Sequence, residues 1–131
     1  MAVIERFEDI EAWKKARELT AATYAASSAG GFARDFGLRD QIRRASVSIM
    51  SNIAEGFERD GNQEFRQFLA IAKGSSGEVK SQLYVALDAH FVTPGEFARL
   101  YGLADESARL IRGFITYLKS SDLRGSKFNR A

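Results

Sequence analysis

Residues 41–59, QIRRASVSIMSNIAEGFER, decide the fold because they have the composition of a helix whose apolar side chains point in more than one direction. The apolar residues recur at three- and four-residue steps in two stripes, which a helix of 3.6 residues per turn places about a third of a turn apart. A helix that is apolar nearly all round is usually covered on more than one side. In so short a chain, we expect a second copy of the protein to supply the additional cover. The first stripe consists of Ile42, Ala45, Ile49 and Ile53, and the second of Val47, Met50, Ala54 and Phe57.

A narrow polar line separates the two apolar stripes, and it consists of Gln41, Arg44, Ser48, Asn52 and Glu55. A buried polar group costs about 1–3 kcal/mol when it is unpaired, so polar groups between apolar stripes should bond to one another or to a neighbouring subunit. We therefore predict that the polar line, together with Val47, Met50 and Phe57, forms the interface between copies and fixes its register. Plain exposure to solvent in a monomer is the alternative.

The composition limits the classes of protein to which the chain can belong. Its 131 residues make up one domain, and 45% hydrophobic and 27% charged residues are ordinary for a soluble protein. No apolar run approaches the ~18 residues that span a bilayer, and the amino end lacks the features of a secretory signal. The absence of cysteine excludes disulfides and thiolate metal sites and fits a reducing compartment. We expect a cytoplasmic protein without membrane contact.

Four long stretches of the sequence show helical periodicity, whereas β-strand alternation is absent and proline occurs once. The predicted helices comprise residues 10–29, 38–58, 63–89 and about 93–120. Short connections between helices of this length are typical of an up-down-up-down four-helix bundle, so the predicted fold class is all-α. The predicted bundle domain spans residues 1–120, and a flexible tail follows at 121–131. Basic residues dominate this end of the chain: Lys119, Arg124, Lys127 and Arg130.

Three of the predicted helices begin with recognisable capping residues. Asp9 and Asn62 are short polar residues that could accept hydrogen bonds from the free amides of the first and third predicted helices. Thr93, Pro94 and Glu96 give a stronger signal for the fourth helix. They combine a capping hydroxyl, a proline at the first helical position and an acid three residues after the cap. This start is the clearest helix boundary in the sequence.

The middle of the third predicted helix, KGSSGE at residues 73–78, has the composition of a loop. Each glycine costs a helix about 0.5–1 kcal/mol relative to alanine. The apolar pattern of Leu69 and Ala72 nevertheless resumes in phase at Val79 and Leu83, so we predict one continuous helix. We expect the small residues to lie where another backbone approaches closely. Two shorter helices with a break near Gly74 are the alternative.

Segments in several parts of the chain carry a resemblance to a known family. They are FEDIEAWKKA at residues 7–16 with Leu19, QIRRA at 41–45, Ser48 and Ile49, NIAEG at 52–56, and a later group of Phe65, Phe68, Leu69, Ile71, Ala72, Gly74, Ser75 and Glu78. Up to about Leu118, the chain resembles the four-helix-bundle proteins linked to intervening sequences of bacterial 23S ribosomal RNA. The resemblance implies a small bundle that assembles as a ring, usually a homopentamer. For most members of this family no activity is established.

The resemblance also implies kinship with the accessory variability proteins of diversity-generating retroelements. Those proteins are similar basic bundles that associate with a reverse transcriptase and with nucleic acid. The formal net charge of this chain, +2, is lower than that of the more basic accessory relatives. Because those accessory proteins associate with a reverse transcriptase, the resemblance implies such an enzyme as one partner.

Residues suited to catalysis or to metal binding are scarce in the sequence. His90 is the only histidine, so one chain cannot form a multi-histidine site, and the Glu-x-x-His pairs of di-iron bundles are missing. Lys73, Gly74 and Ser75 lack the upstream glycine and the strand of a phosphate-binding loop. We predict a protein with no catalytic residue, no cofactor and no metal.

Two binding roles remain open. Nucleic-acid binding would use phosphate contacts that a ring of copies repeats, from Arg39, Arg43, Arg59, Arg66 and Lys73. The sequence shows no aromatic–basic interleaving of the kind that stacks bases, so such binding should lack sequence preference. The alternative is a protein-directed adaptor for a partner enzyme such as a reverse transcriptase, with no direct contact to RNA or DNA. In both cases we predict a non-enzymatic, homo-oligomeric scaffold.

Overall fold

The apolar stripes of the sequence lie on four long helices: α1 (Glu11–Ala26), α3 (Phe36–Glu58), α4 (Asn62–Asp88) and α5 (Pro94–Leu123). A computed structural model describes residues 4–123 of the chain. A short helix α2 (Gly30–Arg34) and a 3-10 turn η1 (Phe7–Asp9) complete the described part, which contains no β-strand. The predicted all-α fold is confirmed, and α2 lies between the first two predicted helices, where no helix was predicted.

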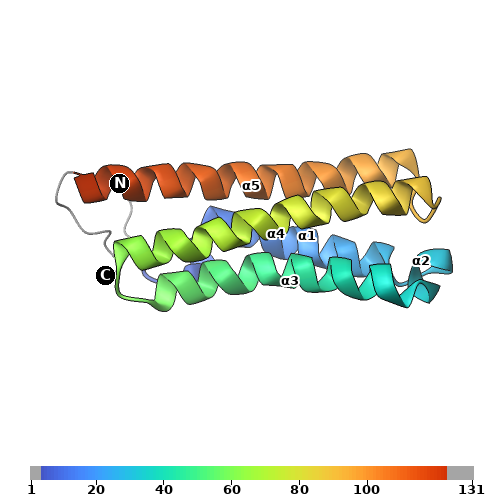
Figure 1. Cartoon of the computed structure of the whole chain (residues 1–131), viewed down its shortest axis with the longest axis horizontal. Coiled ribbons are helices and arrows are strands. Elements are labelled where there is room, and N and C mark those ends of the chain that lie inside the picture. The colour runs from blue at the N-terminus through green and yellow to red at the C-terminus, as the bar shows by residue number, and fades with distance from the viewer. Residues whose placement is uncertain (1–3, 124–131) are drawn as a thin grey trace.

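Successive long helices run in opposite directions (Figure 1). Helix α4 packs against α3 and α5, and helix α1 packs against the same two helices. Helices α1 and α4 therefore occupy opposite corners of the bundle, with α3 and α5 between them. This arrangement is compatible with the predicted up-down-up-down order, to which α2 adds one short turn between α1 and α3.

The first apolar stripe of residues 41–59 faces the middle of the bundle. Ile42, Ile49 and Ile53 are fully buried there. Burying a side chain of this size contributes about 1.5–3 kcal/mol relative to leaving it in water, so this stripe anchors α3 to the other helices. Large buried side chains from those helices meet it: Leu19, Phe65, Leu69, Leu83, Ile111 and Leu118.

The second stripe of α3 is only partly exposed. Phe57 is 2% exposed, and its ring packs edge-on against that of Phe65 with 6.1 Å between centroids. Phe57 therefore belongs to the core of one copy, and its predicted place in the interface between copies is wrong. Val47 remains 38% exposed, while Met50 is half-buried against the core. The outward part of the stripe is smaller than the sequence indicated, because α4 covers Phe57 near the carboxyl end of α3.

Two of the predicted N-caps are wrong. Asp9 lies in η1, and α1 begins after Ile10, which caps it without a side-chain hydrogen bond. Asn62 is the first residue of α4 rather than its cap, a position that Gly61 holds. The Asn62 side chain instead donates from Nδ2 to the Leu118 carbonyl oxygen at 3.0 Å. It thereby joins the beginning of α4 to the end of α5.

The predicted capping box at the start of α5 is confirmed. The amide of Glu96 donates to Thr93 Oγ1 at 3.0 Å, and the amide of Thr93 donates to the Glu96 carboxylate at 2.8 Å. Pro94 is the first residue of α5. Two otherwise unpaired donors are thus satisfied reciprocally at a sharp helix start.

Helix α4 ends in a turn that uses His90 where glycine is more common. His90 has φ of 63°, in the left-handed region. Its amide donates to the Leu87 carbonyl oxygen at 3.0 Å. The amide of Phe91 donates to the Ala86 carbonyl oxygen at 2.8 Å. This pair of bonds is the Schellman arrangement that closes helix ends, so His90 has a structural position at the turn between α4 and α5.

Helix α4 runs without a break through residues 73–78, as predicted. The reason given for its glycines is wrong, however. A Cβ atom added at Gly74 or Gly77 would meet no other atom within 4 Å. The two serines between them are buried instead, so Ser75 and Ser76 provide the close packing while both glycines face open space.

The close approach between helices occurs at Gly56 of α3. A Cβ atom at this position would lie 2.7 Å from Cβ of Phe68 and 2.8 Å from Cδ1 of Phe65. Both phenylalanines belong to α4. The absence of a side chain at Gly56 therefore lets α3 and α4 pack directly against each other.

Helix α5 extends to Leu123, past its predicted end near residue 120. The predicted boundary between bundle and tail thus falls inside a helix. Arg124, Lys127 and Arg130 lie outside the described residues. Among residues 4–123, no helix has both the length and the apolar character needed to cross a membrane.

Candidate nucleic-acid interface

Arg43, one of the five predicted phosphate contacts, is bound to the end of α1. Its Nε donates to Ser27 Oγ at 2.8 Å, and its Nη2 donates to the Ser27 carbonyl oxygen at 3.2 Å and to Ser28 Oγ at 3.1 Å. Its guanidinium also lies 4.6 Å from the centre of the Tyr24 ring. A cation that bonds to the last carbonyls of a helix stabilises its carboxyl end. Arg43 therefore fastens α3 to α1.

Arg39 makes a similar set of internal contacts one turn earlier in α3. Its Nη1 donates to the Ala33 carbonyl oxygen at 3.0 Å, and its Nε pairs with Asp40 at 3.0 Å. Its guanidinium lies 4.8 Å from the centre of the Phe36 ring. These contacts hold the short helix α2 against α3.

Arg59 lies between two carboxylates at the turn from α3 to α4. Its guanidinium is 3.0 Å from Glu55 and 3.6 Å from Glu64, and it lies 5.1 Å from the centre of the Phe68 ring. Two acids next to one cation leave this place without excess positive charge. A polyanion would gain little there.

The other two predicted cations, Arg66 and Lys73, lie on α4 along its border with α5. A shallow groove on this border, which we call the basic groove, contains Lys73, Arg112 and Lys119. Among residues 4–121, no carboxylate forms an ion pair with these three side chains, because the nearby Asp105 pairs with Lys80 and Arg109 instead. The groove is completed by Ala70, Gly74, Ile115 and Thr116.

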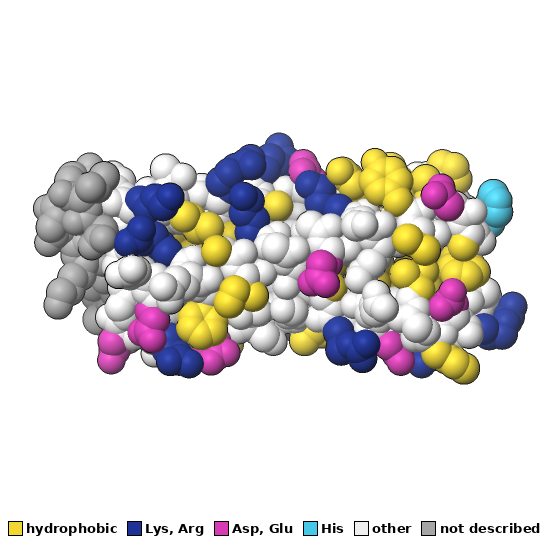
Figure 2. Space-filling view, in the orientation of Figure 1, with side chains coloured by type: hydrophobic (Ala, Val, Ile, Leu, Met, Phe, Trp, Pro, Cys, Tyr) yellow, Lys and Arg dark blue, Asp and Glu magenta, His cyan; other side chains and the backbone are white. Residues whose placement is uncertain are grey.

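The spacing of these cations follows from helix geometry. Residues seven positions apart differ by about 20° around a helix, so Arg66 and Lys73 share one face of α4, and Arg112 and Lys119 share one face of α5. The two rows run antiparallel on either side of the groove. At its end, Arg66 Nε donates to Asn62 Oδ1 at 2.9 Å. Figure 2 shows Lys and Arg side chains gathered over α5 and its border with α4.

The protonation of Asp105 reflects the positive charge of this border. Lys80 Nζ donates to its carboxylate at 2.8 Å, and Arg109 Nε lies 3.5 Å away. The hydrogen bond from Lys80 lowers the pKa of Asp105, and the charges of Lys80, Arg109 and Arg112 lower it further against an opposing effect of desolvation. A carboxylate in this position is held in its charged form by the surrounding cations.

The predicted polar line of α3 lies along the border of α3 with α4. Ser48 Oγ and Ser75 Oγ are 3.0 Å apart, which joins the two helices by a hydrogen bond. Asn52 Nδ2 donates to the Ser48 carbonyl oxygen at 2.8 Å and to its hydroxyl at 3.0 Å. These polar groups find partners within one chain, so they do not require a neighbouring subunit.

The rest of the polar line also makes contacts inside the chain. Gln82 Nε2 of α4 donates to Gln41 Oε1 at 3.4 Å, and Glu55 pairs with Arg59. Arg44 lies in a shallow depression that Glu78 of α4 also lines. The sequence identified the line correctly as a single face of α3, but α4 covers one side of it.

Exposed apolar side chains flank this polar border. Ile71 precedes Ser75 by one turn and Val85 follows Gln82 by one turn, so both lie on the side of α4 that faces α3. Ile71 is 53% exposed and Val85 is 51% exposed. Large apolar groups with this much exposure are candidates for contact with another molecule.

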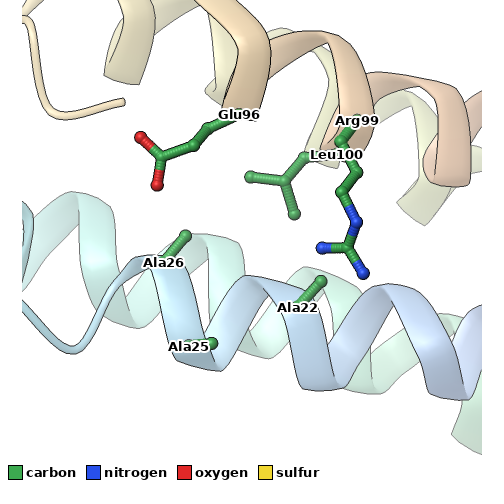
Figure 3. A pocket seen from close by; sticks show the side chains of 6 residues that line it. All are labelled: Ala22, Ala25, Ala26, Glu96, Arg99 and Leu100. Carbon is green, nitrogen blue, oxygen red and sulfur yellow. The ribbon is translucent and has the colours of Figure 1, made fainter. Parts of the chain in front are cut away.

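A further pocket lies at the opposite side of the bundle, between α1 and α5 (Figure 3). Ala22, Ala25 and Ala26 form one wall, and the charged side chains of Glu96 and Arg99 face them from α5. Its volume of about 200 Å³ is below the range of about 300–1,000 Å³ that is typical of ligand sites. Glu96 is already bonded within the capping box. Within residues 4–123, no group of three or more His, Asp or Glu side chains could hold a metal ion.

Sequence reasoning missed two residues of the basic groove. Arg112 was not considered, and Lys119 was assigned to the basic carboxyl end of the chain. A signal was present, because the two cations are seven residues apart and the sequence has no acid between Glu106 and Asp122. Their position opposite Lys73, however, depends on how α4 and α5 pair.

Comparisons with known proteins agree with this fold. A family model described as 23S rRNA-intervening sequence protein matches residues 8–113. The chain is also similar to a crystal structure of a protein of unknown function from the S23 ribosomal protein family of Bacteroides thetaiotaomicron. The TM-score is 0.73 with 20% sequence identity, over 79% of this chain and 97% of that chain. At this identity the likeness supports the fold alone. No curated protein matches the chain significantly.

Proposed function

The chain belongs to the family of 23S rRNA-intervening sequence proteins, and we propose that it is a self-associating helical scaffold that binds nucleic-acid phosphates through the basic groove. The structural relative has no known function, so the proposal depends on the surface of this chain. Two parts of that surface support it: the basic groove of α4 and α5, and the border of α3 with α4.

The basic groove is the observation that carries the nucleic-acid proposal. Lys73, Arg112 and Lys119 face the same groove, and no acid among residues 4–121 pairs with them. Side chains of this kind neutralise phosphates and release the counterions that surround a nucleic acid. Phosphate contacts fix the position of a protein on the strand but do not read the sequence. We therefore propose binding to RNA or DNA without sequence preference.

The salt dependence of binding tests this role. We expect a structured RNA to bind in a gel-shift or filter-binding assay at 50 mM salt and to bind more weakly at 200 mM, because each phosphate contact releases counterions. The double variant Lys73→Gln/Arg112→Gln should bind more weakly and reduce the slope of log affinity against log salt by about 2.

Arg59→Gln is the matched control for this experiment. It removes one positive charge outside the groove, where Glu55 and Glu64 already balance it. Its binding should resemble that of the unchanged protein. Absence of binding at low salt would overturn the proposal, and so would an affinity that does not change with salt. The same holds if Arg59→Gln weakens binding as much as the groove variant does.

Self-association is the second part of the proposal, and we assign it to the border of α3 with α4. The half-exposed Ile71 and Val85 flank the polar groups of this border, and Arg44 and Glu78 lie beside them. Apolar side chains around a bonded polar centre would gain from burial against another copy. The homopentamer that the resemblance implies is our proposed form of this assembly.

The solution mass tests the assembly. After nuclease treatment, we expect the protein to form an oligomer in multi-angle light scattering, and we expect Ile71→Glu/Val85→Glu to reduce the mass to that of a single chain. Ala21→Glu adds an acid at an exposed position of α1 and should leave the oligomer unchanged. A single-chain mass for the unchanged protein at micromolar concentration would exclude self-association.

A protein-directed adaptor is the second candidate function. The observation in its favour is Phe36, which is 64% exposed at the beginning of α3. A large aromatic group of this kind suits an interface with another protein. The proposed partner is an enzyme such as a reverse transcriptase, in keeping with the proposed kinship to retroelement accessory proteins. For both candidate functions we propose a cytoplasmic location. Stable binding to that partner after nuclease treatment, combined with no affinity for RNA, would favour the adaptor.

A further inference from the structure

An aromatic cluster lies on the same border as the basic groove, toward the turn between α4 and α5. It consists of Tyr84, Phe97 and Tyr101. The ring of Tyr84 lies 4.9 Å from that of Phe97 and 5.8 Å from that of Tyr101, measured between centroids. Tyr84 is 50% exposed, so about half of this residue is accessible to another molecule. Figure 2 shows apolar side chains gathered at this end of the α4–α5 border.

The cluster and the groove lie along one line of α4. Lys73, Lys80 and Tyr84 fall within about 40° of one another around the helix axis, so they share a face. Tyr84 is about 16 Å from Lys73 along that axis. On α5, Tyr101 and Lys119 mark the two ends of the opposite row, about 27 Å apart. The border therefore presents the exposed ring of Tyr84, backed by two partly buried rings, at one end and cations at the other.

Lys80 and Asp105 lie between these two ends. The ammonium group of Lys80 is 5.2 Å from the centre of the Tyr101 ring and donates a hydrogen bond to Asp105. Asp105 is the acid on this line, and Lys80 and Arg109 both pair with it. Its charge is therefore compensated at the point where a strand would pass from the groove to the rings.

We propose that the border of α4 with α5 binds a single strand of RNA or DNA, with phosphates in the basic groove and a base stacked on Tyr84. The inference rests on the proposed function and specifies its ligand. In a duplex the bases are stacked on one another and hidden from such a ring, whereas a single strand can place them on an aromatic side chain. A line of about 27 Å is long enough for several nucleotides of a single strand.

Charge and stacking together favour this occupant over other ligands. A positive groove that follows the backbone and exposed aromatic rings that take the bases are the two features of surfaces that bind single strands. The stacking adds affinity without reading sequence, because every base has a flat aromatic face. The sequence alone does not show this combination, since the rings and the cations of each helix are several turns apart.

The experiment compares single-stranded and double-stranded oligonucleotides of about twelve nucleotides by fluorescence anisotropy at one salt concentration. We expect Tyr84→Ala to weaken single-strand binding about tenfold and to leave duplex binding unchanged, because only the single strand can stack. Tyr84→Phe keeps a flat ring and should retain the affinity. Tyr24→Ala removes a tyrosine ring of α1 that is 41% exposed and lies outside the α4–α5 border, and it serves as the matched control.

The variants separate this inference from the function on which it rests. If Lys73→Gln/Arg112→Gln weakens both forms while Tyr84→Ala changes neither, the groove binds phosphates and the stacking inference is wrong. If Tyr84→Ala weakens binding of both the single strand and the duplex equally, the ring supports the fold of the groove and the inference is also wrong. Circular dichroism would then show a loss of helix. If the unchanged protein binds neither form, the proposed function itself fails.

Discussion

Helix α4 has two borders in the bundle, and they are built differently. Toward α3, polar groups bond to each other across the border, as Ser48 and Ser75 do, and Gly56 lets the backbones approach. Toward α5, Lys73 and Arg112 face a groove without a pairing acid among residues 4–121. The first border uses its polar groups to hold the bundle together. The second leaves its charges available to a ligand, and this contrast is the strongest indication of where function lies.

The largest effect should come from closing the space at Gly56. Gly56→Ala places a methyl group 2.7 Å from Cβ of Phe68, so α3 and α4 must move apart. We expect a loss of about 1–3 kcal/mol in the free energy of unfolding, the usual cost of overpacking. Urea denaturation followed by circular dichroism measures it. Unchanged stability would mean that the α3–α4 border is not closely packed at this point.

The opposite sign is expected at the two glycines in the middle of α4. Gly74→Ala and Gly77→Ala should each raise the free energy of unfolding by about 0.5–1 kcal/mol, because alanine favours the helix and meets no neighbour there. The same urea titration provides the test, with Gly56→Ala as the contrasting variant. If either alanine destabilised the protein, the added methyl group would have to meet another copy of the chain, because it meets no atom of its own chain.

The serine bond across the α3–α4 border should contribute a smaller amount. In a double-mutant cycle with Ser48→Ala and Ser75→Ala, we expect a coupling free energy of about 0.5–1.5 kcal/mol. The matching variants of the other border, Lys73→Gln and Arg112→Gln, should change stability by no more than about 0.5 kcal/mol. Equal effects at the two borders would remove the distinction between a structural border and a binding border.

The smallest effect concerns Asp105, which is exposed and screened by water. Its pKa is lowered by the Lys80 hydrogen bond and by nearby cations, so its charged form stabilises the folded chain above its ordinary pKa of 3.8. That contribution is lost as the pH falls through the lower pKa of the folded state. Asp105→Asn should therefore reduce the melting temperature slightly at neutral pH, and the difference should disappear in strong acid. A difference that persists in acid would contradict this origin.

Periodicity in the sequence was sufficient to predict the helices and much of their buried faces. The stripe of Ile42, Ile49 and Ile53 is buried as expected, and Thr93 and Glu96 cap α5 as expected, because both features depend on residues close together in the chain. Such patterns show that a face is covered but do not identify what covers it.

For that reason the candidate sites changed more than the fold. Phe57 is covered by Phe65 of its own chain rather than by a second copy, and the polar line bonds to α4. Lys73 and Arg112 meet only because α4 and α5 pair in antiparallel order, which no local pattern encodes. The basic groove therefore became visible only in three dimensions.

The two exposed glycines of α4 have a consequence for its motion. Helical segments that lack side chains to shield their backbone open more readily, and such openings appear as fast exchange of amide hydrogens with heavy water. The amides around Gly74 and Gly77 should therefore exchange faster than those near Leu69 or Leu83, although they lie at the centre of a long helix. A bound strand that lies against Gly74 would slow this exchange, so the weakest turn of α4 would also report on occupancy of the groove.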